Sequence, residues 1–323
     1  MLHIFYTHSH ITSIVIYDTI RKLLEQGERV VVITRRSQQW KSEKNVSVVD
    51  LSNYTITSLL SISYLKTIKE IKKILTEAIN HTPYYLYIPD SYEIVCSILQ
   101  KSSYCERYYY IEEGSISYAK SFSRHLRITR RIKNVVKNLC GFSTSDFILS
   151  QKFGGTISIS EKAFPWNKKE RIINSPKSYL ENCISGQELF ENYIIFGYLN
   201  VGISQLHYLV DAICRFIKEN HLVSIAAKFH PYSYKVNPSA IKDLTEYMQK
   251  KDIDFTILQN DYVVEKALLL KKSNILSVQD ATSLMIYALQ NGGSAFLFKN
   301  GEEMECYNDY NTYLSESPYL VVD

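Results

Sequence analysis

The sequence predicts an α/β protein made of two doubly wound halves. Short runs rich in Val, Ile and Tyr alternate with helical stretches along most of the 323 residues, which is typical of βαβ units around a parallel sheet. The alternation fades between residues 157 and 185 and then resumes. Because the length allows two domains of ordinary size, we expect one at residues 1–185 and another at 186–323, facing a central cleft.

The first half opens with a strand, and its strand-like runs hold the aliphatic and aromatic residues of a sheet that is buried on both faces. The run RVVVIT is the clearest of them. The expected strands cover residues 2–6, 29–34, 84–89 and 107–111. The expected helices cover residues 11–26, closed by Gly27, then 61–80, with apolar residues at helical spacing, and 91–101.

The polar stretch from 157 to 185 contains Pro165 and Pro176, and we interpret it as a linker or a domain rim. The same alternation of strands and helices follows it. In this second half the expected strands cover residues 193–198, 223–229, 254–258, 273–278 and 294–299. The expected helices cover residues 204–220, 240–251 and 281–291.

The composition indicates an ordinary globular protein, with 46% hydrophobic and 22% charged residues. No apolar run approaches the roughly 18 residues that span a bilayer, and the first residues lack the basic region and cleavage site of a signal peptide. We therefore expect a cytoplasmic protein. The six cysteines form no CxxC pair and no Cys/His cluster, so no metal site and no cofactor are expected.

Glu112-Glu113-Gly114 directly follows the strand expected at 107–111, and parallel α/β sheets bind ligands outside the carboxyl ends of their strands. One carboxylate of such a pair suits a general base, and Gly114 allows a sharp turn. Neighbouring side chains of an extended chain point to opposite faces. We therefore prefer Glu113 as the base, with Glu112 as its support or substitute. The alternative is a solvated turn before a helix.

His230-Pro231 ends the strand expected at 223–229. The proline holds His230 in an extended conformation, and an imidazole titrates near neutral pH, so it can donate a proton or carry charge beside a phosphate. Lys228 lies two residues earlier, on the same face, and can add a second cation. A capping or core histidine is the alternative interpretation.

Two further sites follow expected strands. Thr282-Ser283 opens the helix expected at 281–291, where hydroxyls and free backbone N–H groups form an anion site. A plain helix cap is the alternative. His8 and His10 follow the first strand and are expected on the acceptor side of the cleft, although one of them can instead cap the next helix.

Residues 120–137 carry seven cations and no acidic residue, with Leu, Ile and Val between them. A solvated helix face usually mixes both signs, so this one-sided charge indicates an anionic partner. An amphipathic basic helix fits an anionic membrane surface. Nucleic acid is not expected, because no recognition motif or stacking platform lies nearby.

The order of Glu112-Glu113-Gly114, His230-Pro231 and Thr282-Ser283 resembles the signature of bacterial sialyltransferases of lipooligosaccharide, capsule and O-antigen synthesis. The resemblance runs from Glu112 to about Ser283, and Thr282 stands where many members have a serine. It implies the two-domain GT-B architecture. Residues 1–185 would then bind the acceptor, and residues 186–323 would bind the CMP-sugar.

The resemblance also implies a reaction. CMP-sialic acid would be the donor, and a terminal sugar of a lipid-linked surface glycan, galactose in α2,3 linkage, would be the acceptor. Transfer would invert the anomeric carbon without a metal. The basic charge of residues 120–137, and not the resemblance, predicts a protein peripheral to the inner membrane. The two alternatives are a GT-B transferase that uses another nucleotide sugar and a non-catalytic protein that binds membranes or polyanions.

Overall fold

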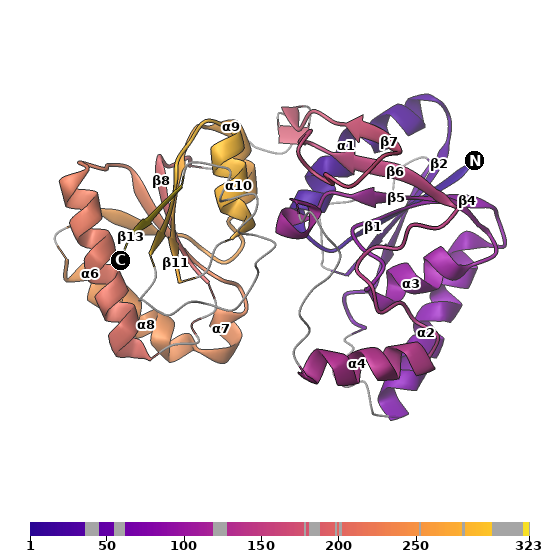
Figure 1. Cartoon of the computed structure of the whole chain (residues 1–323), viewed down its shortest axis with the longest axis horizontal. Coiled ribbons are helices and arrows are strands. Elements are labelled where there is room, and N and C mark those ends of the chain that lie inside the picture. The colour runs from indigo at the N-terminus through magenta and orange to yellow at the C-terminus, as the bar shows by residue number, and fades with distance from the viewer. Residues whose placement is uncertain are drawn as a thin grey trace. The chain divides into compact units, whose positions relative to one another are not determined.

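The computed structural model divides the chain into two compact units (Figure 1). Unit 1 comprises Met1–Glu113 and Ser117–Cys183, and unit 2 comprises Gly114–Ile116 and Ile184–Asp323. The boundary expected between residues 185 and 186 lies outside the described residues. The structure describes residues 1–35, 45–54, 62–118, 128–177, 179–180, 188–197, 199, 202–251, 253–279, 282–298 and 319–322.

Unit 1 is built on a parallel sheet with the strand order β3-β2-β1-β4-β5-β6-β7. Its strands are β1 (Leu2–Thr7), β2 (Arg29–Thr34), β3 (Val46–Asp50), β4 (Tyr84–Ile88), β5 (Cys105–Ile111), β6 (Phe153–Ser158) and β7 (Glu170–Ile173). Its helices are α1 (His10–Glu25), α2 (Ile62–Ile79), α3 (Ile94–Lys101) and α4 (Ile128–Leu139), and the 3₁₀ turn η1 spans Gly114–Tyr118.

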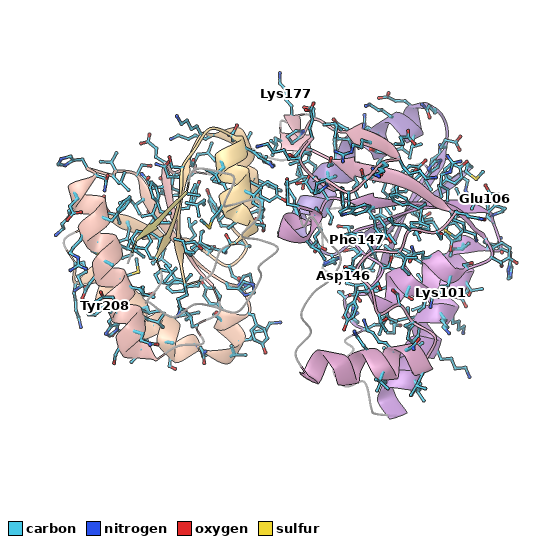
Figure 2. All side chains as sticks on the ribbon, viewed as in Figure 1. Lys101, Glu106, Asp146, Phe147, Lys177 and Tyr208 are labelled. Carbon is cyan, nitrogen blue, oxygen red and sulfur yellow. The ribbon has the colours of Figure 1, made fainter. Side chains whose placement is uncertain are left out.

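Aromatic rings pack on both faces of this sheet, so many of the tyrosines belong to the core. On one face the ring of Tyr87 stacks on Phe5, with centroids 4.1 Å apart, and on Tyr109, at 5.2 Å. On the other face Tyr110 meets the edge of Phe147, a residue labelled in Figure 2, at 4.8 Å. Tyr110 also shares a 2.6 Å hydrogen bond with Ser91, which keeps its hydroxyl paired inside the unit.

β7 lies in the stretch from 157 to 185 that the sequence led us to interpret as a linker, and β6, which the sequence did not predict, ends at the first two residues of that stretch. β6 pairs with β5, and β7 pairs with β6, so the linker interpretation is wrong for residues 157–158 and 170–173. Neither strand has the continuous apolar run of a buried strand, and each departs from it for a physical reason. Gly154 leaves room for Tyr109, since a Cβ there would lie 2.7 Å from that ring. β7 closes the row of strands, and its side chains are mostly exposed, so it needs no apolar run.

Unit 2 also contains a parallel sheet, with the order β10-β9-β8-β11-β12-β13. Its strands are β8 (Asn192–Phe196), β9 (Ile225–Phe229), β10 (Phe255–Ile257), β11 (Asn274–Val278), β12 (Ala295–Phe298) and β13 (Tyr319–Val322). Its helices are α6 (Ile203–Glu219), α7 (Ser233–Val236), α8 (Pro238–Gln249), α9 (Val264–Leu270) and α10 (Ser283–Gln290).

Each sheet reverses its strand order at one place. In unit 1 the chain runs from β1 outward to β2 and β3 and then returns to β4 on the other side of β1. In unit 2 it runs from β8 to β9 and β10 and returns to β11 beside β8. A crevice outside the carboxyl ends of the strands forms at such a reversal. The candidate ligand sites therefore lie beyond β1 and β4 in unit 1 and beyond β8 and β11 in unit 2.

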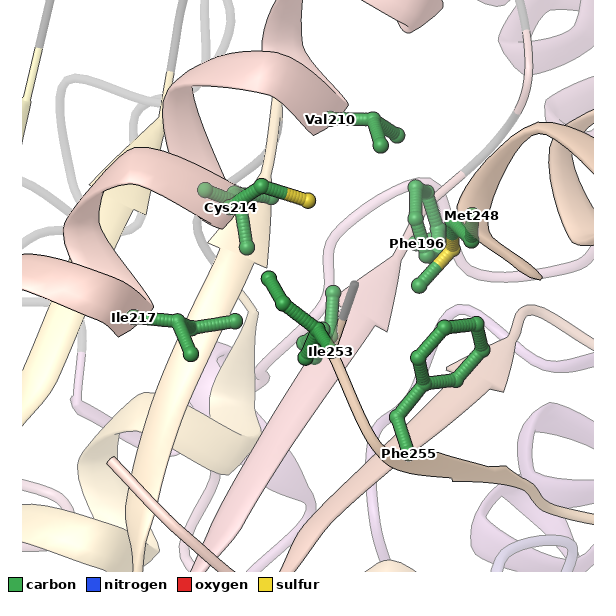
Figure 3. Close-up of a pocket in the computed structure, with 9 residues that line it drawn as sticks. Phe196, Val210, Cys214, Ile217, Met248, Ile253 and Phe255 are labelled. Atoms are coloured by element: carbon green, nitrogen blue, oxygen red, sulfur yellow. The ribbon is translucent and has the colours of Figure 1, made fainter. Parts of the chain in front are cut away.

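A small cavity inside unit 2 is a packing void rather than a ligand site. It measures about 10 Å³ and lies among apolar side chains of α6, α8 and the sheet (Figure 3). The lining includes Val210, Cys214, Met248 and Phe255. That volume is close to the least that holds one water, so a nucleotide or sugar does not fit there.

Candidate functional site

Charged side chains gather at the carboxyl end of the sheet in unit 1. Four adjacent strands contribute to them, because each strand is followed by at least one ionisable residue at its exit. The set consists of Arg35 after β2, His8 after β1, Asp90 and Glu93 after β4, and Glu113 after β5. We call these five residues the unit 1 cluster.

Glu113 and His8 form an ion pair within this cluster. Oε1 of Glu113 lies 2.5 Å from Nε2 of His8, and both side chains are about four-fifths buried. Burial alone would lower the pKa of His8, but the neighbouring charge of Glu113, with smaller contributions from Asp90 and Glu93, raises that pKa above its ordinary value. The pairing with Glu113 therefore favours the cationic form of His8.

Glu112 has a different environment from Glu113. It is fully buried, its Oε1 accepts a 2.6 Å hydrogen bond from the Tyr118 hydroxyl, and its Oε2 accepts a 2.9 Å bond from the Ile159 backbone N–H. The alternative of a solvated turn is thus wrong for Glu112. Gly114 has φ +53°, a left-handed conformation that reverses the chain after the two glutamates. Glu112 supports the turn from which Glu113 projects.

Asp90 is a site residue that the sequence analysis missed. Its Oδ1 accepts a 2.7 Å hydrogen bond from the backbone N–H of Glu93. Burial, helped by the nearby charge of Glu113, raises the pKa of Asp90 to about 7. The signal was present in the sequence, because Pro89-Asp90 follows a buried strand just as His230-Pro231 does.

Glu93 and Arg35 complete the unit 1 cluster. Nη1 of Arg35 donates a 2.9 Å hydrogen bond to Oε1 of Glu93, and its Nη2 donates a 2.7 Å bond to the backbone carbonyl of Tyr54. The Tyr6 hydroxyl donates to the same Glu93 oxygen at 3.2 Å. Burial alone would raise the pKa of Glu93, but the charge of Arg35 and then of His8 lowers it below its ordinary value. Glu93 is therefore charged and already paired.

His10 is the first residue of α1, and Ser9 caps this helix. The Ser9 hydroxyl accepts from the backbone N–H of Thr12, and the Thr12 hydroxyl accepts from the backbone N–H of Ser9. The idea that one of the two histidines caps α1 is therefore wrong. Ser9 instead fixes the chain between His8, which reaches Glu113, and His10.

His230 lies at the carboxyl end of the sheet in unit 2, directly after β9. Its backbone N–H donates a 2.9 Å bond to the carbonyl of Phe196, at the end of β8. Its Nδ1 accepts a 3.1 Å bond from the backbone N–H of Tyr232, the residue after Pro231. A neutral imidazole that accepts at Nδ1 carries its proton on Nε2. The His-Pro turn thus presents Nε2–H as a hydrogen-bond donor.

Lys228 lies inside β9 and is buried. Its Nζ donates to the backbone carbonyl of Gln259, which follows β10. Burial lowers the pKa of Lys228 to about 8, although the charges of Asp261 and Glu265 oppose this shift. Lys228 is therefore directed toward the loop after β10, and its service as a second cation beside a phosphate stays a prediction.

Thr282 occupies the N-cap position of α10 without capping it. Its backbone is extended, and its side chain makes no capping hydrogen bond to the helix. Oγ1 of Thr282 is buried and has no hydrogen-bond partner within the part of the chain that the structure describes. Ser283 then begins the helix, half-buried. This geometry disagrees with a plain helix cap, because the Thr282 side chain accepts from no N–H group of the first turn.

The basic segment is described only in part. Residues 119–127 and the side chains of 128–133 lie outside the described residues. Lys137 is buried, its Nζ donates a 2.5 Å bond to the carbonyl of Tyr92, and it lies 3.0 Å from the centroid of the Tyr92 ring. Counting Lys137 among cations for a membrane surface is therefore wrong, because its charge is used inside unit 1.

Among the described side chains of α4, two apolar ones are exposed. Val135 and Leu139, one helical turn apart, are 60% and 82% exposed. Across the described ranges no helix has the length and apolar character to cross a bilayer. The same residues also contain no group of three or more His, Cys, Asp or Glu side chains arranged to hold a metal ion.

Comparisons with known proteins identify the fold. No protein-family model and no curated protein matches the chain. The UDP-GlcNAc 2-epimerase of Methanocaldococcus jannaschii aligns over 100% of this chain and 89% of its own, with 12% identity and a TM-score of 0.54. A Listeria monocytogenes protein, named provisionally as a UDP-N-acetylglucosamine 2-epimerase, aligns over 92% and 78%, with 10% identity and a TM-score of 0.54.

A glycosyltransferase from Rickettsia africae also aligns, over 100% of this chain and 84% of its own, with 11% identity. Its TM-score of 0.43 is too low to bear on function. At such identities a likeness shows the fold alone. The two parallel sheets and these alignments confirm the fold class, a pair of Rossmann-like units of the GT-B type.

Proposed function

We propose that this chain is an inverting, metal-independent glycosyltransferase that transfers sialic acid from CMP-sialic acid to a terminal sugar of a bacterial surface glycan. The observation that carries the proposal is the 3.1 Å hydrogen bond from the Tyr232 backbone N–H to Nδ1 of His230, which leaves Nε2 to carry the proton of a neutral ring. A neutral imidazole with its proton on Nε2, at the carboxyl end of a parallel sheet, suits the phosphate of a leaving CMP. Pro231 fixes the turn, and Thr282 and Ser283 at the uncapped start of α10 offer backbone N–H groups to the same anion.

The unit 1 cluster supplies the other half of the reaction. The hydroxyl oxygen of the acceptor forms a bond to the anomeric carbon while the bond from that carbon to the phosphate oxygen of CMP breaks. The hydroxyl proton passes to Glu113, and the electron pair of the broken bond leaves with CMP. Attack from the face opposite CMP inverts the anomeric carbon. Glu113 is the carboxylate for this step because Glu112 has both oxygens committed to Tyr118 and Ile159.

The acceptor we propose is a galactose-terminated glycan, joined in α2,3 linkage and carried on a lipid at the inner membrane. The support is the basic sequence of residues 120–137 together with the exposed Val135 and Leu139 on α4. Cations next to apolar side chains suit an anionic lipid surface. Such docking would place unit 1 where a lipid-linked acceptor is presented.

A second candidate is an enzyme that acts on a different nucleotide sugar. The M. jannaschii epimerase has been solved in complex with UDP-GlcNAc and UDP, and this chain aligns with it at a TM-score of 0.53. A UDP-sugar carries two phosphates, whereas CMP-sialic acid carries one. The two candidates therefore differ in the charge that the end of the sheet in unit 2 must stabilise.

A donor panel separates these candidates. The purified chain would be incubated with a soluble galactoside and, in turn, CMP-sialic acid, a CMP-Kdo donor, UDP-galactose and UDP-GlcNAc, with a chelator present throughout. We expect CMP release and sialylated product from CMP-sialic acid alone, at a rate that the chelator leaves unchanged. Turnover of a UDP-sugar, or a requirement for added Mg²⁺ or Mn²⁺, would contradict the proposal. Binding to anionic vesicles without turnover of any donor would favour the non-catalytic alternative.

A further inference from the structure

The backbone of Glu113 is fixed by a hydrogen bond to a buried side chain. The N–H of Glu113 donates a 2.8 Å bond to Oγ of Ser117. Ser117 lies in η1 and is fully buried, so water does not compete for this bond. The direction in which the Glu113 side chain leaves the sheet therefore depends on how firmly Ser117 is held.

The connection between β6 and β7, residues 159–169, contacts this turn at two points. Its first residue, Ile159, donates its backbone N–H to Oε2 of Glu112 at 2.9 Å. Five residues later the backbone N–H of Phe164 donates a 2.5 Å bond to the carbonyl of Ser117. We call residues 159–169 the bracing loop, because these two bonds join it to the chain on either side of Glu113.

Phe164 reaches Ser117 from a strained backbone conformation. Its φ is +52°, in the left-handed region that a residue with a bulky side chain rarely adopts. The Phe164 side chain is fully buried, and its ring meets the ring of Trp166 edge-on, with centroids 5.5 Å apart. Such a conformation persists only where the surrounding structure holds it. The bracing loop therefore needs an anchor at Phe164.

Arg171 in β7 provides this anchor. Its Nη1 donates a 2.9 Å bond to the carbonyl of Glu161, and its Nη2 donates to the carbonyls of Phe164 at 2.7 Å and Asn167 at 3.2 Å. A guanidinium presents several N–H donors in one rigid plane, so it can bind three carbonyls at once. The backbone of Arg171 is itself fixed, because β7 pairs with β6 at Thr156.

We propose that Arg171 is a positioning residue for Glu113. The proposal rests on the proposed function, in which Glu113 is the base. Three hydrogen bonds in series connect the two residues: the guanidinium binds the Phe164 carbonyl, the Phe164 N–H binds the Ser117 carbonyl, and the Ser117 hydroxyl binds the Glu113 N–H. Arg171 therefore acts on the direction of the carboxylate and not on its charge.

Arg171→Ala tests the proposal. Asn167 keeps its own bonds to Thr156 and to the carbonyl of Glu170, so we expect the fold to survive. A displacement of about 1 Å at a reacting group can cost about 10²-fold. With CMP-sialic acid and a soluble galactoside, kcat for transfer should therefore fall about 10-fold to 10²-fold. Donor hydrolysis without acceptor should persist at nearly the wild-type rate, because no acceptor proton then passes to Glu113.

The ratio of transfer to hydrolysis separates positioning from a loss of folded enzyme, since fewer folded molecules lower both rates equally. A wild-type ratio in Arg171→Ala would overturn the proposal. If the alanine variant does not fold, Arg171→Lys carries the test. It keeps the charge but has one nitrogen in place of the guanidinium plane, so its ratio should also fall, and a wild-type ratio there would overturn the proposal as well.

The control is Lys168→Ala, which removes an exposed cation from the same loop. It should keep the wild-type ratio of transfer to hydrolysis. A fall as large as that of Arg171→Ala would show a general effect of charge and would contradict a role for the three carbonyl bonds.

A second readout needs no donor. Hydrogen exchange followed by NMR should show the backbone N–H groups of Phe164 and Glu113 exchanging about 10-fold faster in Arg171→Ala, the equivalent of losing about one hydrogen bond. Lys168→Ala should leave both unchanged. If Phe164 exchanges faster and Glu113 does not, the proposal is wrong whatever the donor is. If both exchange faster but the wild-type enzyme does not use CMP-sialic acid, the positioning by Arg171 stands and the proposed function fails.

Discussion

The carboxyl ends of the two sheets have the same architecture and opposite chemistry. In unit 1 the residues that follow the strands include three carboxylates, Asp90, Glu93 and Glu113, beside one arginine and one histidine. In unit 2 they include His230 and the uncapped start of α10. The strand order reverses in the same way in both. The comparison teaches that the same strand order can place two candidate sites of different charge, because a few residues at the strand exits set the chemistry of each.

The two strand-end histidines make this difference concrete. His8 is bonded through Nε2 to a carboxylate, which favours its cationic form. Nδ1 of His230 accepts a hydrogen bond from a backbone N–H. This donor opposes protonation of Nδ1. The same residue type is therefore paired with a carboxylate in unit 1 and accepts a hydrogen bond from a backbone N–H in unit 2.

The largest expected effect belongs to His230. His230→Ala should lower kcat about 10²–10⁴-fold, the usual cost of losing an acid–base group. The phosphate of the departing CMP then has no Nε2–H group to donate a hydrogen bond to it. Donor hydrolysis in the absence of acceptor should fall with transfer. Kinetics at saturating CMP-sialic acid, with circular dichroism to verify folding, measure the change. A folded variant with near-normal turnover would remove His230 from the reaction.

The next comparison separates Glu113 from Glu112. Glu113→Gln should lower transfer about 10²-fold while slow donor hydrolysis persists, since water needs no positioned acceptor. Glu112→Gln should act on stability instead, at a cost of about 1–3 kcal/mol, because the amide cannot accept from both Tyr118 and Ile159. Initial rates and urea unfolding of both variants provide the test. If Glu112→Gln lowers transfer and Glu113→Gln lowers only stability, Glu112 is the base.

Changing Arg127, Arg130 and Arg131 together to Glu sharpens the comparison at the acceptor side. Each cation near an anionic surface contributes about 1 kcal/mol, so binding to anionic vesicles should weaken at least about 10²-fold. Transfer to a soluble galactoside should be unchanged. Co-sedimentation and the soluble assay, each repeated at high salt, measure the two activities. A loss of soluble turnover would assign these arginines to substrate binding, and persistent sedimentation would place the anchor elsewhere.

The smallest expected effect concerns Lys228. Because burial lowers its pKa to about 8, the unfolded chain binds more protons than the folded one between about pH 8 and 10.5, and stability rises with pH across this window. Lys228→Met should therefore stabilise unit 2 at pH 7, and the gain should vanish above about pH 10.5. Thermal unfolding at several pH values checks this. If the variant also loses affinity for CMP, Lys228 is a phosphate ligand as well.

The sequence predicted the buried strands well, because a parallel sheet that is covered on both faces requires continuous apolar runs. β2 lies at Arg29–Thr34, the range expected. β3, β6, β7 and β13 were missed. β7 is exposed, and β3, at the far end of the sheet, holds only one fully buried residue, Val46. Strands at the edge of a sheet form because they pair with a neighbouring strand. The hydrophobic periodicity of their own sequence does not show this pairing.

The candidate site was predicted in part for a related reason. Strand-end motifs indicated Glu113 and His230, but no pattern in the sequence gives the partner of either side chain. The bond from Tyr232 to His230 and the His8–Glu113 pair depend on turn geometry and on the order of β1, β4 and β5. Asp90 went unnoticed because its importance comes from burial beside Glu113. Lys137 was misassigned because charge alone does not show which side of a helix is covered.

The contact between Lys137 and Tyr92 fixes the rotational phase of α4. Successive residues of an α-helix are about 100° apart, so Val135 and Leu139 each lie about 200° around the axis from Lys137. With Lys137 held under Tyr92, the helix cannot roll without breaking a hydrogen bond and a cation–π contact. A surface that docks on the face of α4 opposite Lys137 therefore meets the apolar positions 135 and 139 in one fixed orientation.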